Sequence, residues 1–494
     1  MIRNIAANFL GRGFAVFSLF FFIPLYIDIL GFQNYSVISF TLIVATVLMI
    51  LDAGLTATLS RELARSDRSP GQKRNIFGTL ETLYIGIALG TGLILFGLAE
   101  RIALNWVRVS DYSVSEVALL LKILAIEVGF QMLLRFYLGG LIGLERQVQA
   151  NVFQATWVAI RNGVVVLIIL QWPTLYAFFV WQILATATSA LVLRQVLTKA
   201  IGFERQFMMP QGVDPAVLRE IWRFAAGMLL IAAVAALNTQ LDKVAISKLL
   251  PVEELGYYSL AIALVMMLPA VVGPLNMALL PRFVALYSGG RSDDALRLFR
   301  AGAGISATLI FSVVVHFVFY AEEVIWVWTG DTEIALKAKE YLSILSIGYA
   351  MLALASAPYT IAIAHGDTRM NNILGIASLF VTVPGYFLAV RYYGGAGAAV
   401  VFGATQTAIT FIYLAWVDRK FLHIGVPILL FHLLLVPFGV ASLVVYCMSA
   451  IAVSGSRWMT IIGLAFSFVV TLLVGLLRLG RGVYLDLSAR IENR

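Results

Sequence analysis

Long apolar runs recur along almost the whole chain and are separated by short polar segments. A run of about 20 apolar residues crosses the hydrocarbon layer of a membrane as a helix, and open sheets are excluded there because their amides would lack hydrogen-bond partners. The pattern therefore predicts an all-α polytopic membrane protein with about 14 transmembrane helices. Their predicted bounds are 8–29, 35–60, 76–98, 117–141, 151–170, 174–196, 222–247, 256–280, 300–320, 340–363, 371–390, 396–417, 427–450 and 458–477.

One hydrophilic segment, residues 199–218, divides six predicted spans from the next six. The two flanking parts resemble each other, because ILGFQNYSVISFTLIV at the second span is similar to EELGYYSLAIALVMML at the eighth. Six spans return the chain to the side on which it began, so a duplication gives two parallel lobes around a central cavity. We predict a first lobe at 1–198, a cytoplasmic linker at 199–218, a second lobe at 219–421, and two extra helices with a cytoplasmic tail at 422–494.

The composition and the charge distribution agree with a membrane environment. Hydrophobic residues make up 61% of the chain and charged residues 13%, against about 25% charged in soluble domains. With the N-terminus in the cytoplasm, 23 of the 35 Lys and Arg residues fall on the cytoplasmic side and 7 on the other, which predicts that both termini are cytoplasmic. This asymmetry explains the net charge of +8 without a nucleic-acid partner.

Soluble chemistry has little room in this chain. No polar segment exceeds about 25 residues, which excludes a soluble catalytic or nucleotide-binding domain, and no GxxxxGK[ST] run is present. The single cysteine, Cys447, excludes an intramolecular disulfide, and the four histidines show no metal-ligand spacing. His316 is expected to be a hydrogen-bonded core histidine. We predict a protein that is not an enzyme and that holds neither a metal nor a cofactor.

Polar and charged residues recur at helical spacing inside several predicted spans. A charge near the bilayer midplane costs roughly 2.5–3.5 kcal/mol, so such residues are expected to face a polar interior that marks a substrate or ion path. Residues at i, i+4 and i+8 lie on one helical face. The polar faces are Asn4, Asn8 and Arg12; Asp52, Thr56 and Ser60; Glu127, Gln131 and Arg135; Asn151, Gln154 and Arg161; and Asn238, Asp242 and Lys243.

Cations outnumber acids within the predicted spans. The set is Arg12, Lys122, Arg135, Arg161 and Lys243 against Asp52, Glu127 and Asp242. An excess of buried cations suits an anionic substrate, and arginine is the preferred partner of phosphate because its planar fork donates two hydrogen bonds. Alternatively, the charges pair internally and hold helices together, with Glu127–Arg135 and Asp52–Arg161 as candidate pairs. Glu81 lies near a predicted span end and is expected to be solvated.

Three segments resemble one membrane-protein family. They are NTQLDKVAISKLLPVEELGYYSLAIAL, LDAGL with Arg61 shortly after it, and LGFQNYSV. They are similar to the polysaccharide flippases of the multidrug/oligosaccharidyl-lipid/polysaccharide exporter superfamily, and the resemblance extends over residues 1–420. It implies two rocking lobes that carry an undecaprenyl-pyrophosphate-linked oligosaccharide, a repeat unit of O-antigen or exopolysaccharide, across the bacterial inner membrane. The implied partners are this lipid, the membrane lipids, a polysaccharide polymerase and a chain-length regulator.

Other functions stay open on these residues. Fourteen-helix relatives flip the peptidoglycan lipid precursor and use their last two helices as a groove for the lipid tail, a role that the uncharged spans 427–450 and 458–477 would suit. A drug or cation antiporter of the same superfamily would need an excess of buried acids instead. A membrane-embedded polysaccharide polymerase, which is an enzyme, would need a large external loop or a His-centred site.

The resemblance also implies that cations in the central cavity face the pyrophosphate. The residues that we expect to bind it are Arg161, Arg135, Lys243 and Arg12. A carboxylate whose cation partner turns to the substrate is left uncompensated and can take up a proton or a sodium ion. The candidate coupling acids are Glu127, Asp242 and Asp52.

Overall fold

The computed structural model describes residues 18, 20–52, 54–109, 112–202, 212–449 and 455–492, and within them the chain is helical with no strand. Twelve of the described helices are long and apolar enough to cross a membrane. One of them, Arg369–Leu422, contains a non-helical residue at Gly394 and covers two predicted spans. Counting it twice and adding the shorter apolar helix Phe20–Leu30 gives fourteen spans, in agreement with the hydropathy pattern.

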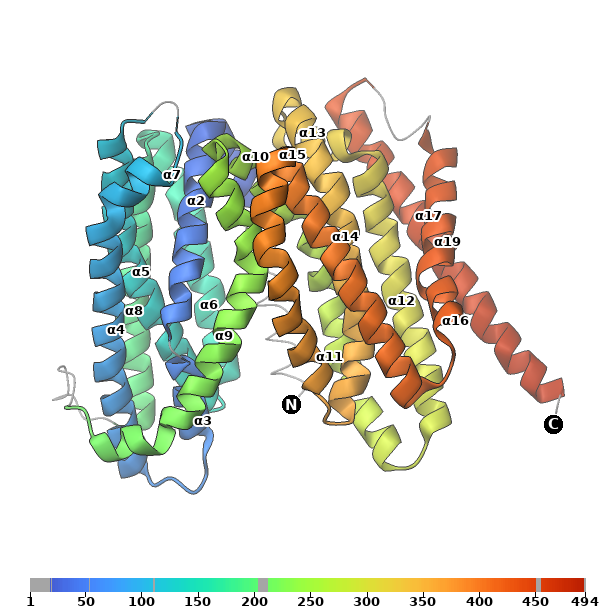
Figure 1. Ribbon diagram of the computed structural model, residues 1–494, viewed down its shortest axis with the longest axis horizontal. Coiled ribbons are helices and arrows are strands. Elements are labelled where there is room, and N and C mark those ends of the chain that lie inside the picture. Colours follow the sequence, from blue (N-terminus) through green and yellow to red (C-terminus); the bar gives the residue numbers. More distant parts are fainter. Residues whose placement is uncertain are drawn as a thin grey trace. The chain divides into compact units, whose positions relative to one another are not determined.

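The chain divides into two compact units, Met1–Gly256 (unit 1) and Tyr257–Arg494 (unit 2). Unit 1 is coloured from blue to green in Figure 1, and its first described helix is Phe20–Leu30. The elements that follow are α2 (Phe32–Leu48), η1 (Met49–Asp52), α3 (Leu55–Ala64), α4 (Pro70–Asn105), α5 (Val114–Gly143), α6 (Gln147–Ala159), η2 (Ile160–Val164), α7 (Val165–Gln171), α8 (Leu175–Ile201) and α9 (Pro215–Leu249). Here η1 is a 3-10 turn and η2 is a π-helical turn.

Local sequence signals fix where these helices begin. Ser69 and Gln72 form a capping box at α4, in which each side chain bonds the backbone N–H of the other, and Pro70 occupies the first helical position. Asp214 is the N-cap residue of α9, and its Oδ1 accepts a hydrogen bond from the backbone N–H of Ala216. Because of the capping box, α4 begins six residues before the predicted span 76–98.

The predicted span 35–60 is interrupted in its middle. A 3-10 turn at Met49–Asp52 follows α2, and α3 begins after Gly54. Gly54 has a φ of 68°, and a Cβ atom there would lie 2.6 Å from the carbonyl oxygen of Ala225 in α9. Glycine is required because it accepts a positive φ and allows this close approach. The span therefore consists of two helices rather than one.

By its contacts α9 belongs with unit 1, although the sequence places it at the start of the second lobe (Figure 1). It packs against α2, η1, α3 and α4. At one end, Val217, Ile221 and Ala225 form a buried stripe at helical spacing. At the other end, Trp106 Nε1 of the segment after α4 donates to Ser247 Oγ at 3.0 Å. The division of the chain into two lobes stays a prediction.

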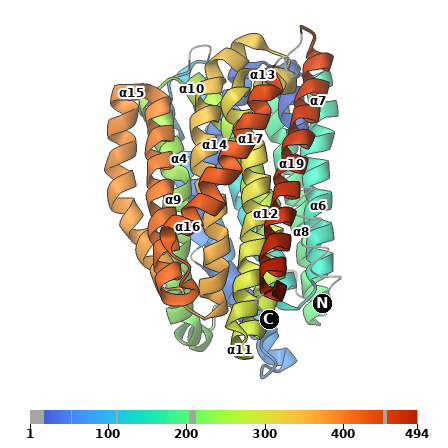
Figure 2. The ribbon, with the colours of Figure 1, turned by 90° about the vertical axis from the view of Figure 1, so that its right-hand side faces the viewer.

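Unit 2 is built from the helices of the second half, yellow-green to red in Figure 2. Helix α10 (Val252–Val265) crosses the boundary between the units. The elements that follow are α11 (Met267–Ser288), α12 (Ser292–Phe319), α13 (Ala321–Thr329), α14 (Thr332–Ala364), α15 (Arg369–Val417), η3 (Asp418–Leu422), α16 (Val426–Leu430), η4 (Phe431–Leu435), α17 (Val436–Cys447) and α19 (Arg457–Glu492). Both η3 and η4 are π-helical turns.

The last membrane helices are packed into unit 2. Figure 2 shows α17 and α19 beside α12, and all three contact one another. His316 of α12 is buried, with its Nδ1 donating to the Ser312 carbonyl at 2.7 Å and its Nε2 accepting from Ser467 Oγ of α19 at 3.0 Å. The expectation of a hydrogen-bonded core histidine is confirmed.

Candidate functional site

Arg161 and Glu127 form an ion pair inside unit 1. Arg161 Nη2 donates to Glu127 Oε1 at 2.8 Å, and the two side chains are 15% and 2% exposed. Gln131, one turn further along α5, donates its Nε2 to the same oxygen at 2.7 Å. The structure thus pairs Glu127 with Arg161 rather than with Arg135. The pair joins the middle of α5 to the π-helical turn η2.

Arg161 lies in the wide turn at Ile160–Val164, and such turns are frequent at functional sites. Its guanidinium carbon is 5.5 Å from the ring centroid of Trp157, and its carbonyl accepts from Gln182 Nε2 of α8 at 3.3 Å. Four buried polar atoms here have no hydrogen-bond partner within the described residues: Trp157 Nε1, Arg161 Nε, Gln182 Oε1 and Thr186 Oγ1. Buried polar groups are normally bonded, so these atoms are available to ordered water or to a ligand.

Arg135 differs from Arg161 in having neither an ion pair nor a hydrogen bond to any described residue, and it is exposed. Its charge acts on Tyr84 of α4. The Tyr84 hydroxyl donates to Asp52 Oδ1 at 2.5 Å, and the Thr56 hydroxyl donates to the same oxygen at 2.5 Å. Asp52 is therefore held by neutral groups, and the candidate pair Asp52–Arg161 does not form.

The other predicted site residues lie elsewhere or cannot be placed. Asp242 is buried on α9, and Lys243 Nζ lies 3.5 Å from Asp242 Oδ1 while donating to the Thr239 carbonyl at 2.5 Å. Lys243 is thus neutralised by its chain neighbour. Arg12 lies outside the described residues, as do Asn4 and Asn8.

Glu81 contradicts the expectation of a solvated carboxylate. It is 2% exposed, and it accepts from Arg194 Nε at 2.6 Å, from Arg194 Nη2 at 3.0 Å and from the Tyr137 hydroxyl at 2.9 Å. The error arose because α4 begins at Pro70, so that Glu81 lies eleven residues inside the helix. The signal that was missed is Arg194, which interrupts the apolar run of α8 and supplies the partner of Glu81.

Lys122 does not add to the interior charge. Its Nζ is 2.9 Å from Glu100 Oε1, and the two side chains are 28% and 70% exposed. The predicted excess of cations falls from two to one for this reason, because Glu100 was not among the predicted acids, whereas Arg161 and Lys243 pair with the predicted acids Glu127 and Asp242. Of the predicted set, Arg135 is the cation for which the described residues supply no acidic partner.

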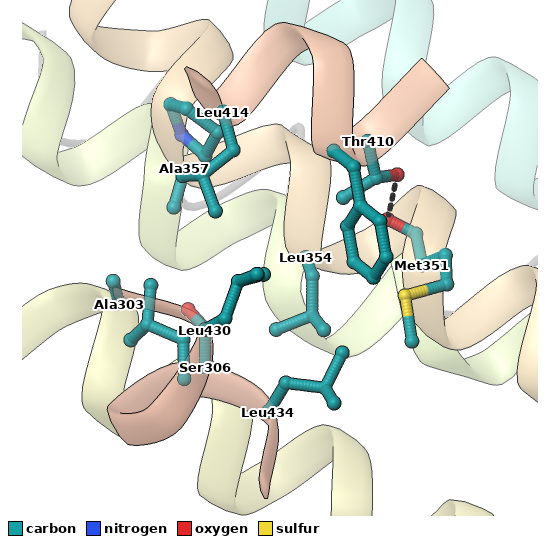
Figure 3. Close-up of a pocket in the computed structure, with 12 residues that line it drawn as sticks. Ala303, Ser306, Met351, Leu354, Ala357, Thr410, Leu414, Leu430 and Leu434 are labelled. Atoms are coloured by element: carbon teal, nitrogen blue, oxygen red, sulfur yellow. Dashed lines mark hydrogen bonds between the residues drawn. The ribbon is translucent and has the colours of Figure 1, made fainter. Parts of the chain in front are cut away.

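Unit 2 contains an apolar pocket between α12, α14, α15 and the turn from α16 into η4 (Figure 3). It is lined by Ala303, Ser306, Met351, Leu354, Ala357, Pro358, Thr410, Phe411, Leu414, Leu430, Leu433 and Leu434. The Thr410 hydroxyl donates a hydrogen bond to the Met351 carbonyl at 2.9 Å, drawn as the dashed line in Figure 3. Ser306 Oγ is buried and has no partner among the described residues. No charged side chain lines the pocket, so it suits apolar groups.

The apolar helices, the ion pairs buried between them and a cation left open on one of them define a multi-pass membrane transporter. A family model described as polysaccharide biosynthesis protein matches residues 1–287, more than half of the chain, so the chain belongs to that family. A second model, MatE, matches residues 228–388. The resemblance to the polysaccharide flippases of the multidrug/oligosaccharidyl-lipid/polysaccharide exporter superfamily is confirmed.

Individual relatives are distant in sequence and similar over most of their length. A Shigella flexneri protein described as "Putative O-antigen transporter" is 20% identical over 399 residues, which cover 79% of this chain and 91% of that protein. A solved "Lipid II flippase MurJ", in an inward closed conformation, gives a TM-score of 0.74 at 14% identity over 99% of this chain and 100% of its own. An inward-facing MATE multidrug transporter gives 0.65 at 13% identity, over 84% and 94%. At these identities the solved structures establish the fold.

Proposed function

We propose that this chain translocates an undecaprenyl-pyrophosphate-linked oligosaccharide repeat unit across the bacterial inner membrane by alternating access. The family and the description of the Shigella flexneri relative support this substrate class. The asymmetry of Lys and Arg residues supports an orientation with both termini and the α3–α4 loop in the cytoplasm. A polysaccharide polymerase and a chain-length regulator would act on the translocated product, and no enzymatic step belongs to the chain itself.

The observation that carries this proposal is the contrast between Arg135 and Arg161. Arg135 has no acidic partner among the described residues, whereas Arg161 has one carboxylate and a buried Nε without a partner. A pyrophosphate presents several oxygens, and an arginine fork binds two of them at once. We expect Arg135 to make the first contact with the pyrophosphate. Arg161 makes the second when it leaves Glu127.

Coupling follows from the same exchange. When Arg161 turns to the substrate, the Gln131 amide is the partner that the described residues leave to Glu127 within a buried site. A buried carboxylate without a counter-charge is costly, so a proton or a sodium ion is expected to replace the guanidinium. Glu127 is therefore our first candidate for the coupling acid. Asp242 and Asp52 are the further candidates.

Substitution of Arg161 tests the binding role. In cells that lack the native gene, Arg161→Ala is expected to abolish surface polysaccharide while the protein stays in the membrane, because the Glu127 carboxylate left behind can take up a proton. Arg161→Lys should restore only part of it, because an ammonium group cannot form the two-pronged contact. Arg391→Ala, which removes an exposed arginine of unit 2, is the matched control and should leave polysaccharide normal. Normal polysaccharide in Arg161→Ala at normal expression would make the ion pair purely structural.

Purified protein in liposomes tests the coupling role. Transport of the lipid-linked substrate is measured with and without an imposed pH or sodium gradient, for the wild type, Glu127→Gln and Asp242→Asn. We expect the wild type to respond to one gradient and Glu127→Gln to lose that response. If neither gradient changes the transport rate, Glu127 and Asp242 serve only as ion-pair partners of Arg161 and Lys243.

A peptidoglycan-precursor flippase is the second candidate, because the likeness to the "Lipid II flippase MurJ" structure covers 99% of this chain, the last two helices included. Both substrates carry a pyrophosphate, so the arginine variants do not separate the two functions. Complementation does: growth of cells depleted of their own lipid II flippase would support the second candidate. Rescue of surface polysaccharide without rescue of growth would support the first.

A further inference from the structure

Three arginines surround one buried acid at the end of unit 1 where α3 leads into α4. We call Arg61, Arg65 and Arg68, together with Glu62 and Asp67, the arginine cluster. Glu62 is 1% exposed and accepts from Arg61 Nη1 at 2.8 Å, Arg68 Nη2 at 3.1 Å and Arg65 Nη1 at 3.3 Å. Asp67 accepts two further hydrogen bonds from Arg65, at 2.6 and 3.0 Å. Three arginines thus face two acids, which leaves the cluster one positive charge in excess.

Glu220 of α9 neutralises that charge. Its Oε1 is bonded by Arg68 Nη2 and lies 3.7 Å from Arg65 Nη1. The Glu220 side chain is 48% exposed, whereas that of Arg68 is 11% exposed. Arg68 Nε is buried and has no partner within the described residues. The carboxylate of Glu220 therefore uses only part of the donors of Arg68, and a phosphate group, with more oxygens, would use more of them.

This end of α9 is held by the buried stripe Val217, Ile221 and Ala225 and by a few polar or charged side-chain contacts, of which Glu220 is one. The Arg61 guanidinium carbon lies 4.6 Å from the ring centroid of Phe224, and Asn75 Nδ2 donates to Asp214 at 2.8 Å. Beyond the buried stripe that ends at Ala225, residues 226–241 include no buried residue. The contact of Glu220 with the arginine cluster is thus one of the few charged attachments of this end, and its loss would weaken the docking that the buried stripe provides.

We propose that the arginine cluster binds the phosphate of a lipid headgroup, that Glu220 is the carboxylate that occupies this site when no phosphate is present, and that phosphate binding releases this end of α9. Both anions would bond Arg68 Nη2, and two like charges a few ångströms apart repel each other. The two states are therefore mutually exclusive. By linkage, a change that weakens the docking of Glu220 strengthens phosphate binding by the same factor.

The position of the cluster favours a lipid headgroup. It lies at the loop between two membrane spans, where headgroups lie, and Lys73 and Arg74 add positive charge in the first two turns of α4. In the proposed orientation this is the cytoplasmic face, on which the carrier lipid is loaded. The identity of the lipid as a pyrophosphate carrier rests on the proposed function. An anionic phospholipid and free pyrophosphate are the other sources of the same chemistry.

Release of α9 can be measured as a distance between two spin labels. The labels are placed at Gly71→Cys on α4 and Ala216→Cys on α9, both exposed positions, in a chain whose native cysteine is removed by Cys447→Ser. The protein is placed in nanodiscs of phosphatidylcholine alone, with phosphatidylglycerol, with undecaprenyl pyrophosphate, or with free inorganic pyrophosphate in solution.

We expect undecaprenyl pyrophosphate to lengthen the distance between the labels. An equal response to phosphatidylglycerol would support the site and assign it to anionic lipids in general. A response to free pyrophosphate alone would overturn the lipid assignment. An unchanged distance under every condition would overturn the proposal as a whole.

Variants of the cluster separate docking from binding. Glu220→Gln is expected to lengthen the distance in phosphatidylcholine alone and to tighten binding of undecaprenyl pyrophosphate about fivefold. Arg68→Ala should lengthen the distance and abolish the response to lipid. Arg219→Gln, the exposed neighbour of Glu220, is the matched control and should change neither. Equal binding by Glu220→Gln and the wild type would contradict the proposal.

The outcome here is independent of the Arg161 test. Loss of surface polysaccharide in Arg161→Ala, together with no response of the label distance to any lipid, rejects the arginine-cluster site alone. Normal polysaccharide in Arg161→Ala, together with a label distance that responds to lipid phosphate, rejects the proposed pyrophosphate role of Arg161 alone.

Discussion

The interiors of the two units are held together by different chemistry. Unit 1 has ion pairs between buried side chains, of which Arg161 with Glu127 is the one on the proposed substrate face. Unit 2 joins its helices by neutral hydrogen bonds, such as Asn276 Nδ2 to Ser356 Oγ at 2.6 Å. The ion pairs found among the described residues of unit 2 lie at helix ends and loops.

This difference indicates a division of labour. Charged side chains inside a membrane protein are costly unless they are paired. Charged residues buried in unit 1 are therefore candidates for a functional role. We expect unit 1 to handle the charged headgroup of the substrate. The pocket of unit 2 between α12, α14, α15 and α16 has no charged lining, so we expect no contact with the headgroup there.

The largest expected effect comes from breaking a buried ion pair of unit 1. Glu81→Ala leaves the guanidinium of Arg194, whose side chain is 19% exposed, without its carboxylate, which is expected to cost up to about 3 kcal/mol. Thermal unfolding and size-exclusion chromatography in detergent measure this loss. The double variant Glu81→Leu with Arg194→Leu should recover much of it, because the unpaired charge is gone. A wild-type unfolding midpoint for Glu81→Ala would show that unit 1 does not depend on its buried pairs.

The next largest effect is a loss of transport without a loss of stability. Arg135→Ala should strongly reduce transport in liposomes and leave the unfolding midpoint near that of the wild type, because the described residues supply no partner that would be orphaned. Arg391→Ala, an exposed arginine of unit 2, serves as the matched control and should change neither quantity. If the two variants behave alike in transport, the assignment of the headgroup to unit 1 loses its support.

A smaller effect is expected in unit 2. Asn276→Ala removes one neutral hydrogen bond to Ser356, for a cost of about 1 kcal/mol, and should leave transport intact. The measurements are again the unfolding midpoint and the transport rate. A loss of transport as deep as that of Arg135→Ala would erase the difference between the units.

The smallest effect is expected from pH at the loop ends, where the two units are alike. Asn75 holds the pKa of Asp214 in unit 1 below its usual range, and Lys420 does the same for Asp367 in unit 2. Each carboxylate contributes stability above its unfolded pKa of about 3.9 and loses it as the pH falls through the lower folded pKa. The distance between labels at Gly71→Cys and Ala216→Cys should therefore stay constant from about pH 8 to pH 5.5. Lengthening within this range would point to another titrating group at the start of α9.

Most of the fold could be predicted from hydropathy, because a lipid environment permits helices and excludes open sheets. The span count, the apolar runs and the position of His316 followed from the sequence in this way. The interruption at Gly54 could not be predicted, because LDAGL reads as an ordinary apolar helix until α9 is known to pack against it. The docking of α9 on unit 1 depends on contacts far apart in sequence, which periodicity does not encode.

The sequence could predict which helix positions carry the polar residues of the candidate site. It could not predict which of these residues form ion pairs. Helical spacing predicted one polar face of α5 for Glu127 and Arg135; the structure buries Glu127 against Arg161 and leaves Arg135 exposed. Spacing does not tell which neighbouring helix supplies the partner, so the pair with Arg161 was not singled out. Glu81 was misplaced for a different reason: depth in the membrane depends on where a helix begins, and the capping box moved that point outward.

The π-helical turn at Ile160–Val164 has a consequence for how relatives should be aligned. An α-helix advances about 100° per residue, and a π-helical turn takes up one extra residue, so the helix beyond it is out of phase with the helix before it. A relative that lacks this residue would present a different side chain where Arg161 stands, even at an ungapped position. Comparison of substrate contacts across the family should therefore be made by position in space around this turn, with a one-residue gap placed there when the turn is absent.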